Sequence, residues 1–108
     1  MAKHTGGEII TKYLIKEGVK YVVGIPGHGN LPLVDAFYKD KDKIQLIQPK
    51  TENAGIHFSV GYYRITGQPL CVFTSIGPGA MNTAIGLADA YVDSFPVLCL
   101  TGSTHIHM

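Results

Sequence analysis

LCVFTSIGPG, at residues 70–79, passes from an apolar run directly into a loop of small residues. Side chains alternate between the two faces of a strand, so the unbroken apolar run at 70–74 predicts a strand that is buried on both faces. Ser75–Gly79 predicts a tight loop, because glycine leaves the backbone room and proline fixes φ. Strands buried on both faces occur almost only in parallel sheets that helices cover.

The same pattern continues outward in both directions along the chain. Short apolar runs predict further strands at 21–23, 44–47 and 97–100. End signals and helical spacing predict four helices, from Thr5 to Gly18, from Asn30 through Phe37, from Thr51 to Gly67 and from Ala80 to about Asp93. We therefore expect an α/β domain with a flavodoxin-like, three-layer parallel sheet and helices on both faces.

Two of these helices carry more specific signals. Thr5 and Glu8 fit a capping box at the start of the first helix. An apolar stripe predicts its buried face, formed by Ile9, Ile10, Tyr13 and Leu14. In the third helix Gly55 and Gly61 each cost about 1 kcal/mol relative to alanine. Their presence predicts that the sheet, another helix or a partner subunit packs against the backbone of this helix.

The amino-acid composition limits which kinds of protein this chain can be. The 108 residues are 45% apolar and 16% charged, which fits a single globular domain with a core. The net charge is +1 and the basic residues are scattered, which argues against nucleic-acid and membrane partners. Cys71 and Cys99 lie in apolar runs and are expected to be buried reduced thiols, as in a cytoplasmic protein. A disulfide between them is the alternative.

In a parallel sheet, ligands bind beyond the carboxyl ends of the strands. This rule selects the loops Gly24–Asn30, Gln48–Glu52 and Ser75–Gly79. The first loop contains Gly27-His28-Gly29, but Pro32 stands where a dinucleotide fingerprint needs its third glycine, and the sequence has no Walker A motif. His28 is either a surface turn residue or a side chain at the mouth of a cleft.

Glu52 also has two interpretations. An acid in the first turn of a helix is favoured by the helix dipole by about 0.3–1 kcal/mol, and by itself that is a sufficient reason for its presence. Alternatively, the carboxylate serves a ligand at the end of the sheet. No metal site is predicted, because His105 and His107 have no evident third ligand.

Three segments together resemble one family, the thiamine-diphosphate-dependent decarboxylases and synthases. GIPGHGNLPLVDAF at 24–37 is similar to its first strand-end loop. KTENAGIHFSVGYYRITGQP at 50–69 resembles its helix that begins with a glutamate, and TSIGPGAMNTAIGLADAYVDSFPVLCLTG at 74–102 resembles the next loop, helix and strand. The resemblance covers nearly the whole chain and is strongest to the acetolactate-synthase-like branch. Details of the loops also resemble the trihydroxycyclohexanedione hydrolases.

The resemblance implies a role for each loop. Glu52 is implied to hydrogen-bond nitrogen N1′ of the aminopyrimidine ring of thiamine diphosphate, which activates the cofactor. His28 is implied to be the second catalytic residue, placed to touch the substrate. The implied cofactor-binding residues are Glu52, Gly27, Pro26, Ser75, Gly77, Pro78 and Asn82.

The family also implies what surrounds this domain. Residues 1–108 are expected to be the N-terminal pyrimidine-binding domain, truncated at its C-terminal end. Mg²⁺ and the diphosphate are implied to sit on a C-terminal domain with a Gly-Asp-Gly signature, which is not found here, and an FAD site of some members would also lie elsewhere. The implied enzyme is a homo-oligomer, a dimer or tetramer, whose subunits share the active site and whose substrate is a 2-keto acid.

Three classes of function remain after this comparison. The first is a part of a carboligase or decarboxylase that is inactive as an isolated fragment. The second is a non-catalytic flavodoxin-like binding module, and the third is a nucleotide-binding domain, which the failed glycine fingerprints weaken. Within the first class, hydrolysis of a ring dione is an alternative to chemistry on 2-keto acids.

Overall fold

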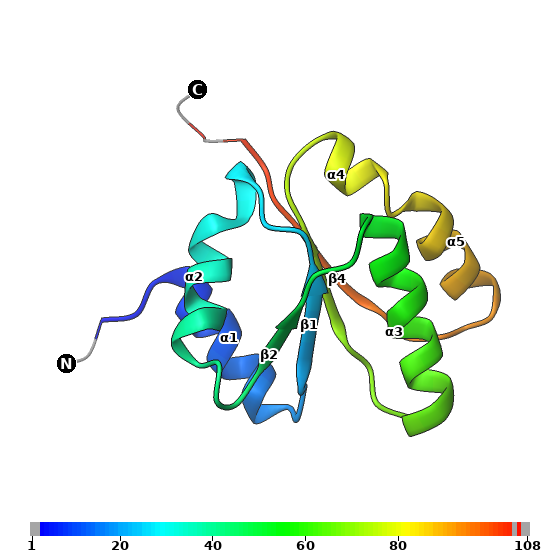
Figure 1. Cartoon of the computed structure of the whole chain (residues 1–108), viewed down its shortest axis with the longest axis horizontal. Coiled ribbons are helices and arrows are strands. Elements are labelled where there is room, and N and C mark those ends of the chain that lie inside the picture. The colour runs from blue at the N-terminus through cyan, green and yellow to red at the C-terminus, as the bar shows by residue number, and fades with distance from the viewer. Residues whose placement is uncertain (1–2, 105, 107–108) are drawn as a thin grey trace.

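The computed structural model describes residues 3–104 and 106 (Figure 1). Helices and strands alternate along the chain as the sequence predicts. The strands are β1 (Tyr21–Gly24), β2 (Gln45–Ile47), β3 (Cys71–Thr74) and β4 (Leu98–Thr101). The helices are α1 (Gly6–Lys16), the 3₁₀ turn η1 (His28–Asn30), α2 (Leu31–Lys39), α3 (Glu52–Thr66), α4 (Pro78–Met81) and α5 (Ala84–Val92).

All described strand pairs are parallel, and the strand order is β2-β1-β3-β4. Helices α1 and α2 lie together on one side of the sheet, while α3 and α5 lie on the other (Figure 1). The predicted three-layer α/β fold is therefore confirmed. Because the chain leaves β1 and β3 toward opposite faces, these neighbouring strands form the switch point at which such sheets bind ligands.

The ends of α3 follow the predicted signals. The hydroxyl of Thr51 accepts a hydrogen bond from the backbone N–H of Ala54 at 3.2 Å, which satisfies a donor that the first turn leaves free. Gly67 ends the helix with φ of 73°, a left-handed conformation that glycine adopts without strain. These caps fix Glu52 as the first residue of α3, after the short loop that follows β2.

The predicted buried face of α1 is wrong. Of its four apolar residues only Leu14 is buried, while Ile9 and Tyr13 are more than half exposed, at 58% and 61%. The helix instead packs against α2 at Gly7, where a Cβ atom would come within 2.7 Å of the carbonyl oxygen of Pro32. Thr11 is also buried. The face with Gly7 and Thr11 is buried instead of the more apolar face because small residues let α1 approach α2 closely.

The predicted single helix at 80–93 is two helices. Helix α4 ends at Met81 and α5 begins at Ala84. Thr83 is buried between them, and its hydroxyl donates to the carbonyl of Ala80 at 2.6 Å, which draws that carbonyl away from a regular helical partner. The interruption turns the chain at Asn82, one of the predicted site residues.

The small residues of α3 have different surroundings. A Cβ atom at Gly55 would touch the side chains of Val23 and Val72 at 3.4 Å, so this part of the helix packs on the sheet, one of the three expected partners. A Cβ at Gly61 would meet nothing within 4 Å among the described residues, so neither the sheet nor another described helix packs there, and contact with a partner subunit stays a prediction.

Both cysteines are free thiols, as expected. The register of β3 and β4 pairs Cys99 with Val72 rather than with Cys71. The two thiols therefore project from opposite faces of the sheet, and the alternative of a disulfide does not hold. Within the described ranges, no helix has the length and hydropathy needed to cross a membrane.

Candidate functional site

The loops after β1 and β3 contact each other at the switch point. The backbone N–H of Gly29 donates to the hydroxyl of Ser75 at 3.1 Å. A Cβ atom at Gly27 would lie 2.7 Å from the side chain of Ser75, and one at Gly29 would lie 2.5 Å from that of Ile76. The glycines of the first loop are therefore needed because the third loop passes so close to them.

Asn30 holds the first loop in shape. The sequence predicts it as the cap of α2, but its side chain turns back instead of bonding to that helix. Its amide oxygen accepts from the N–H of Gly27 at 2.9 Å, and its amide nitrogen donates to the carbonyl of Ile25 at 3.2 Å. Asn30 is only 4% exposed, so these bonds satisfy a buried amide while they fix the turn that carries His28.

Glu52 begins α3 beside α4. Its Oε2 accepts a hydrogen bond from the side-chain amide of Asn82 at 2.8 Å. Its Oε1 lies over Gly79, where a Cβ atom would come within 3.3 Å of it. Next in the chain, Asn53 accepts a bond from the N–H of Gly86 at 2.8 Å, so the start of α3 is also joined to α5.

The side chain of Glu52 lines a shallow pocket of about 560 Å³. Its lining consists of Glu52, Pro78, Gly79, Met81 and Asn82. The pocket combines one carboxylate, one amide and a wall formed by Pro78, Gly79 and Met81. Such a site can accept or share a proton through the carboxylate while a planar ligand lies against the wall.

The structure unites part of the predicted site. Glu52, Pro78 and Asn82 share the pocket, although they come from different segments of the chain. Gly27 and Ser75 lie against each other where the first and third loops meet.

The remaining predicted residues lie apart from this pocket. His28 is exposed on the 3₁₀ turn. Gly77 is exposed with φ of 56°, and a Cβ there would meet nothing within 4 Å among the described residues. Pro26 lines a separate cavity with α2 and β2.

Two residues of this region are missing from the predicted set. Met81 lines the Glu52 pocket, and its position in an apolar helix gave no signal of this. Asn30 was assigned only a capping role. Its place three residues after Gly27, in a loop with three glycines, is the signal for an amide that holds the loop in shape.

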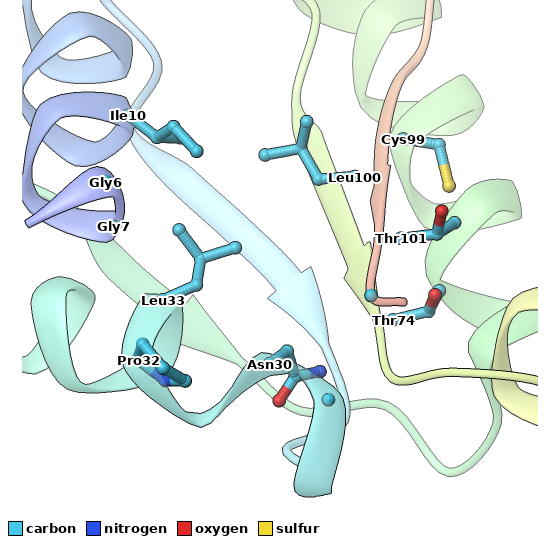
Figure 2. Close-up of a pocket in the computed structure, with 12 residues that line it drawn as sticks. Gly6, Gly7, Ile10, Asn30, Pro32, Leu33, Thr74, Cys99, Leu100 and Thr101 are labelled. Atoms are coloured by element: carbon cyan, nitrogen blue, oxygen red, sulfur yellow. The ribbon is translucent and has the colours of Figure 1, made fainter. Parts of the chain in front are cut away.

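A second, more apolar cavity of about 430 Å³ lies on the α1 and α2 side of the sheet (Figure 2). Ile10, Leu33 and Leu100 point into the space between the helices and β4, while the side chain of Cys99 points away toward the other face (Figure 2). Burial raises the pKa of the Cys99 thiol, so it is held in the neutral form. Among the residues that the structure describes, none with a charged side chain lines this cavity.

His57 lies on α3, where a packing residue is predicted by its distance from the strand-end loops, but the structure leaves it half-exposed beside α5. It is 45% exposed, and its Nδ1 lies 3.7 Å from a carboxylate oxygen of Asp89 on α5. Within residues 3–104 and 106, no group of three or more His, Cys, Asp or Glu side chains is arranged to hold a metal ion. His105 and His107 lie outside the described residues.

Comparison with known proteins shows the family of the chain. Residues 4–108 match the family described as "Thiamine pyrophosphate enzyme, N-terminal TPP binding domain". The chain is 46% identical over 98 residues to the "Probable acetolactate synthase large subunit" of Methanocaldococcus jannaschii, an alignment that covers 90% of this chain and 16% of that protein.

Two further relatives have similar names. The "Acetolactate synthase large subunit" of Haemophilus influenzae is 39% identical over 102 residues, which cover 94% of this chain and 18% of the relative. The mitochondrial "Acetolactate synthase catalytic subunit" of Saccharomyces cerevisiae is 38% identical over 98 residues, which cover 91% and 14%. The chain thus spans less than a fifth of each of these relatives, and it belongs to the thiamine pyrophosphate enzyme family, within the N-terminal TPP-binding domain.

Proposed function

We propose that this chain is the aminopyrimidine-binding part of a thiamine-diphosphate-dependent carboligase or decarboxylase that acts on 2-keto acids. The proposal rests on one observation: the carboxylate of Glu52 lines a pocket together with Pro78 and Gly79. This pocket lies beside the switch point of the sheet. Ligands of open α/β sheets bind at such switch points.

The residues of the pocket fit the cofactor. An aminopyrimidine is a flat ring with a basic nitrogen at its edge, and it needs one acidic partner and a surface to lie against. Glu52 provides the acid, while the absence of a side chain at Gly79 leaves Oε1 uncovered on that side. A Cβ at Gly79 would come within 3.3 Å of this oxygen and so would narrow the place where the ring edge belongs.

When bound, thiamine diphosphate supplies an electron sink for the carbanion that decarboxylation of a 2-keto acid creates. The chain's own contribution is to hold a proton and to place the ring. Glu52 holds the proton that it shares with the ring nitrogen. Pro78 and Gly79 support the ring, and Ser75 fixes the first loop through Gly29. In this proposal His28, which is exposed on that loop, contacts the substrate.

The other predicted site residues have supporting roles in the proposal. Gly27 gives the loop after β1 space to pass Ser75, and Gly77 allows the turn before α4. Pro26 stiffens the first loop from its own cavity beside α2. Asn82 hydrogen-bonds to Glu52, the acid that contacts the cofactor in this proposal.

The complete enzyme in this proposal is larger than the chain. A C-terminal domain binds Mg²⁺ and the diphosphate, residues 1–108 form the first part of the pyrimidine-binding domain, and two or more subunits share the active site. We expect the isolated chain to show no turnover of pyruvate with thiamine diphosphate and Mg²⁺. Some members of this family also carry FAD, which would bind elsewhere in the complete enzyme.

The decisive experiment replaces Glu52 in the complete enzyme. Glu52→Gln keeps the shape of the side chain and removes the acid, and we expect it to slow the exchange of the cofactor's C2 proton for deuterium by about a hundredfold or more. NMR of quenched samples measures this exchange on bound thiamine diphosphate. Far-ultraviolet circular dichroism should show that the fold is unchanged.

Glu8→Gln is the matched control, because Glu8 also lies in the first turn of a helix. If Glu52 served only its own helix end, both variants would change stability and neither would change the exchange rate. Unchanged exchange in Glu52→Gln would therefore refute the proposal. Cofactor binding without measurable exchange in the wild type would instead favour the non-catalytic binding module.

A further inference from the structure

The hydrogen bond between Asn82 and Glu52 joins two segments that are distant in sequence. It connects residues 30 positions apart, from the end of α4 to the start of α3. Its length of 2.8 Å falls within the range of bonds to a charged acceptor. It is also a contact that neither helix needs, because the Glu52 side chain does not cap α3 and the Asn82 side chain does not bond to α4.

The contact gives the two oxygens of the Glu52 carboxylate different surroundings. Oε2 is occupied by the amide of Asn82, whereas Oε1 faces the open position over Gly79. A carboxylate without such a partner would rotate and present either oxygen. One donor on one oxygen therefore fixes which oxygen faces the pocket.

The chemistry of the partner matters as well as its position. An amide donates a hydrogen bond but has no charge and does not titrate. Among the described residues, no lysine or arginine forms an ion pair with Glu52. The carboxylate is thus oriented by a neutral donor on Oε2, which leaves Oε1 free for a partner in the pocket.

The neighbours of Asn82 keep it in place. Its own N–H donates to the carbonyl of Pro78 at 2.9 Å, and the hydroxyl of Thr83 donates to Ala80. On the far side, the bond between Asn53 and the N–H of Gly86 fastens α5 to α3. The helix break at Asn82 is therefore anchored on both sides, and its side chain is held facing the start of α3.

We propose that Asn82 is a positioning residue for Glu52: its amide fixes the carboxylate so that Oε1 is presented to the pyrimidine ring. This inference rests on the proposed function, in which Glu52 is the acid that contacts the ring. Asn82 acts through Glu52, so its removal should matter only while Glu52 is present. A residue that merely ended α4 would act on stability and would not depend on Glu52.

A double-mutant cycle in the complete enzyme tests this dependence. We expect Asn82→Ala to slow C2 exchange roughly tenfold in the wild-type background, the low end for a bond to a charged group, since Asn82 is exposed in this chain. In the Glu52→Gln background the same change should have less than about a twofold effect, because interacting residues are not additive. Asn82→Asp should be worse than Asn82→Ala, because it places a second carboxylate beside the first.

Asn53→Ala is the matched control, since it removes a neighbouring amide that also joins the start of α3 to another helix, α5, but contacts a backbone N–H. We expect it to lower the Tm of the cofactor-free enzyme more than Asn82→Ala does, and to act equally in both backgrounds. Calorimetric titration should show that Asn82→Ala weakens binding of thiamine diphosphate without this loss of Tm.

Equal effects of Asn82→Ala in both backgrounds would overturn the positioning role. So would an Asn82→Asp variant that exchanges at the wild-type rate. If Glu52→Gln itself left exchange unchanged, the proposed function would fail, and the role of Asn82 would fail with it. Slow exchange in Glu52→Gln with normal exchange in Asn82→Ala would refute only the role of Asn82.

Discussion

At the scale of single residues, the candidate site depends on a position without a side chain. Gly79 lies in the first turn of α4, where a Cβ atom would sit 3.3 Å from Oε1 of Glu52. That distance is shorter than ordinary contact, so either the carboxylate or the loop must move. Any side chain at position 79 would therefore displace the Glu52 carboxylate or the loop by steric contact, although Gly79 forms no bond to that carboxylate.

We expect Gly79→Ala to weaken binding of thiamine diphosphate by about tenfold in the complete enzyme, since the added methyl group moves the acid by a few tenths of an ångström and well-placed groups are sensitive to such shifts. Calorimetric titration measures this change. Stability should change little, because the residue is only partly buried. Wild-type affinity in this variant would remove Gly79 from the site.

Gly77→Ala provides a contrasting variant in the same loop. A Cβ at Gly77 would meet no described atom within 4 Å, but the residue has φ of 56° and ψ of −117°, which other amino acids rarely adopt. Substitution here should therefore lower stability through backbone strain rather than by filling the pocket. A loss of Tm in Gly77→Ala but not in Gly79→Ala would separate the two causes.

At the scale of secondary structure, the position of Asn82 depends on how closely α5 approaches α3. The helices meet at Gly86, where a Cβ atom would lie 2.6 Å from the Cβ of Ile56, a fully buried residue. No rearrangement of a flexible side chain relieves that overlap, because the contact is close to the backbone. The helix axes would have to separate.

Gly86→Ala is expected to destabilise the protein by about 1–3 kcal/mol, the usual cost of overpacking. Gly61→Ala is its control on α3, because a Cβ there meets open space among the described residues. That change should stabilise the protein by up to about 1 kcal/mol through helix propensity. Urea unfolding of both variants measures the difference, and equal effects would contradict the packing of α5 on α3.

At the scale of the whole molecule, the core contains a thiol that stays protonated up to an unusually high pH. Cys71 is fully buried among Leu14, Val22 and Phe73 on the face toward α1 and α2. Burial raises the pKa of Cys71 to about 12, with a smaller contribution from Cys99. In the unfolded chain the same thiol ionises near pH 9.0.

This difference predicts that stability decreases between pH 9 and pH 12. The unfolded chain loses the proton first, so rising pH favours unfolding with a slope of up to about 1.4 kcal/mol per pH unit for one thiol. Urea unfolding from pH 8 to pH 10.5 should show the decrease, and Cys71→Ala should make the slope smaller while it lowers stability at every pH. An unchanged slope in that variant would contradict the assignment.

Much of the fold follows from local features of the sequence. Apolar runs such as 70–74, the caps at Thr5 and Thr51 and the stop at Gly67 act within a few residues, so they predicted the order and type of the elements and the three-layer sheet. The strand-end rule then selected the loops that meet at the switch point. Within the described residues, both strands at the edges of the sheet were also predicted.

The sequence by itself thus determined the layered architecture, the family and the position of Glu52 as the first residue of α3. Only the tertiary structure decided that α1 is buried along Gly7 and Thr11, that the last predicted helix breaks at Asn82, and that Asn30 turns back into its own loop. The physical reason is that burial in the folded chain decides which local possibility is used. Caps and periodicity are set by neighbours within about four residues, whereas the buried face of α1 is set by its contact with the distant Pro32. Asn30 and Thr83 bond to groups that are near in sequence, but both residues are buried by the tertiary structure, and local patterns do not describe that burial.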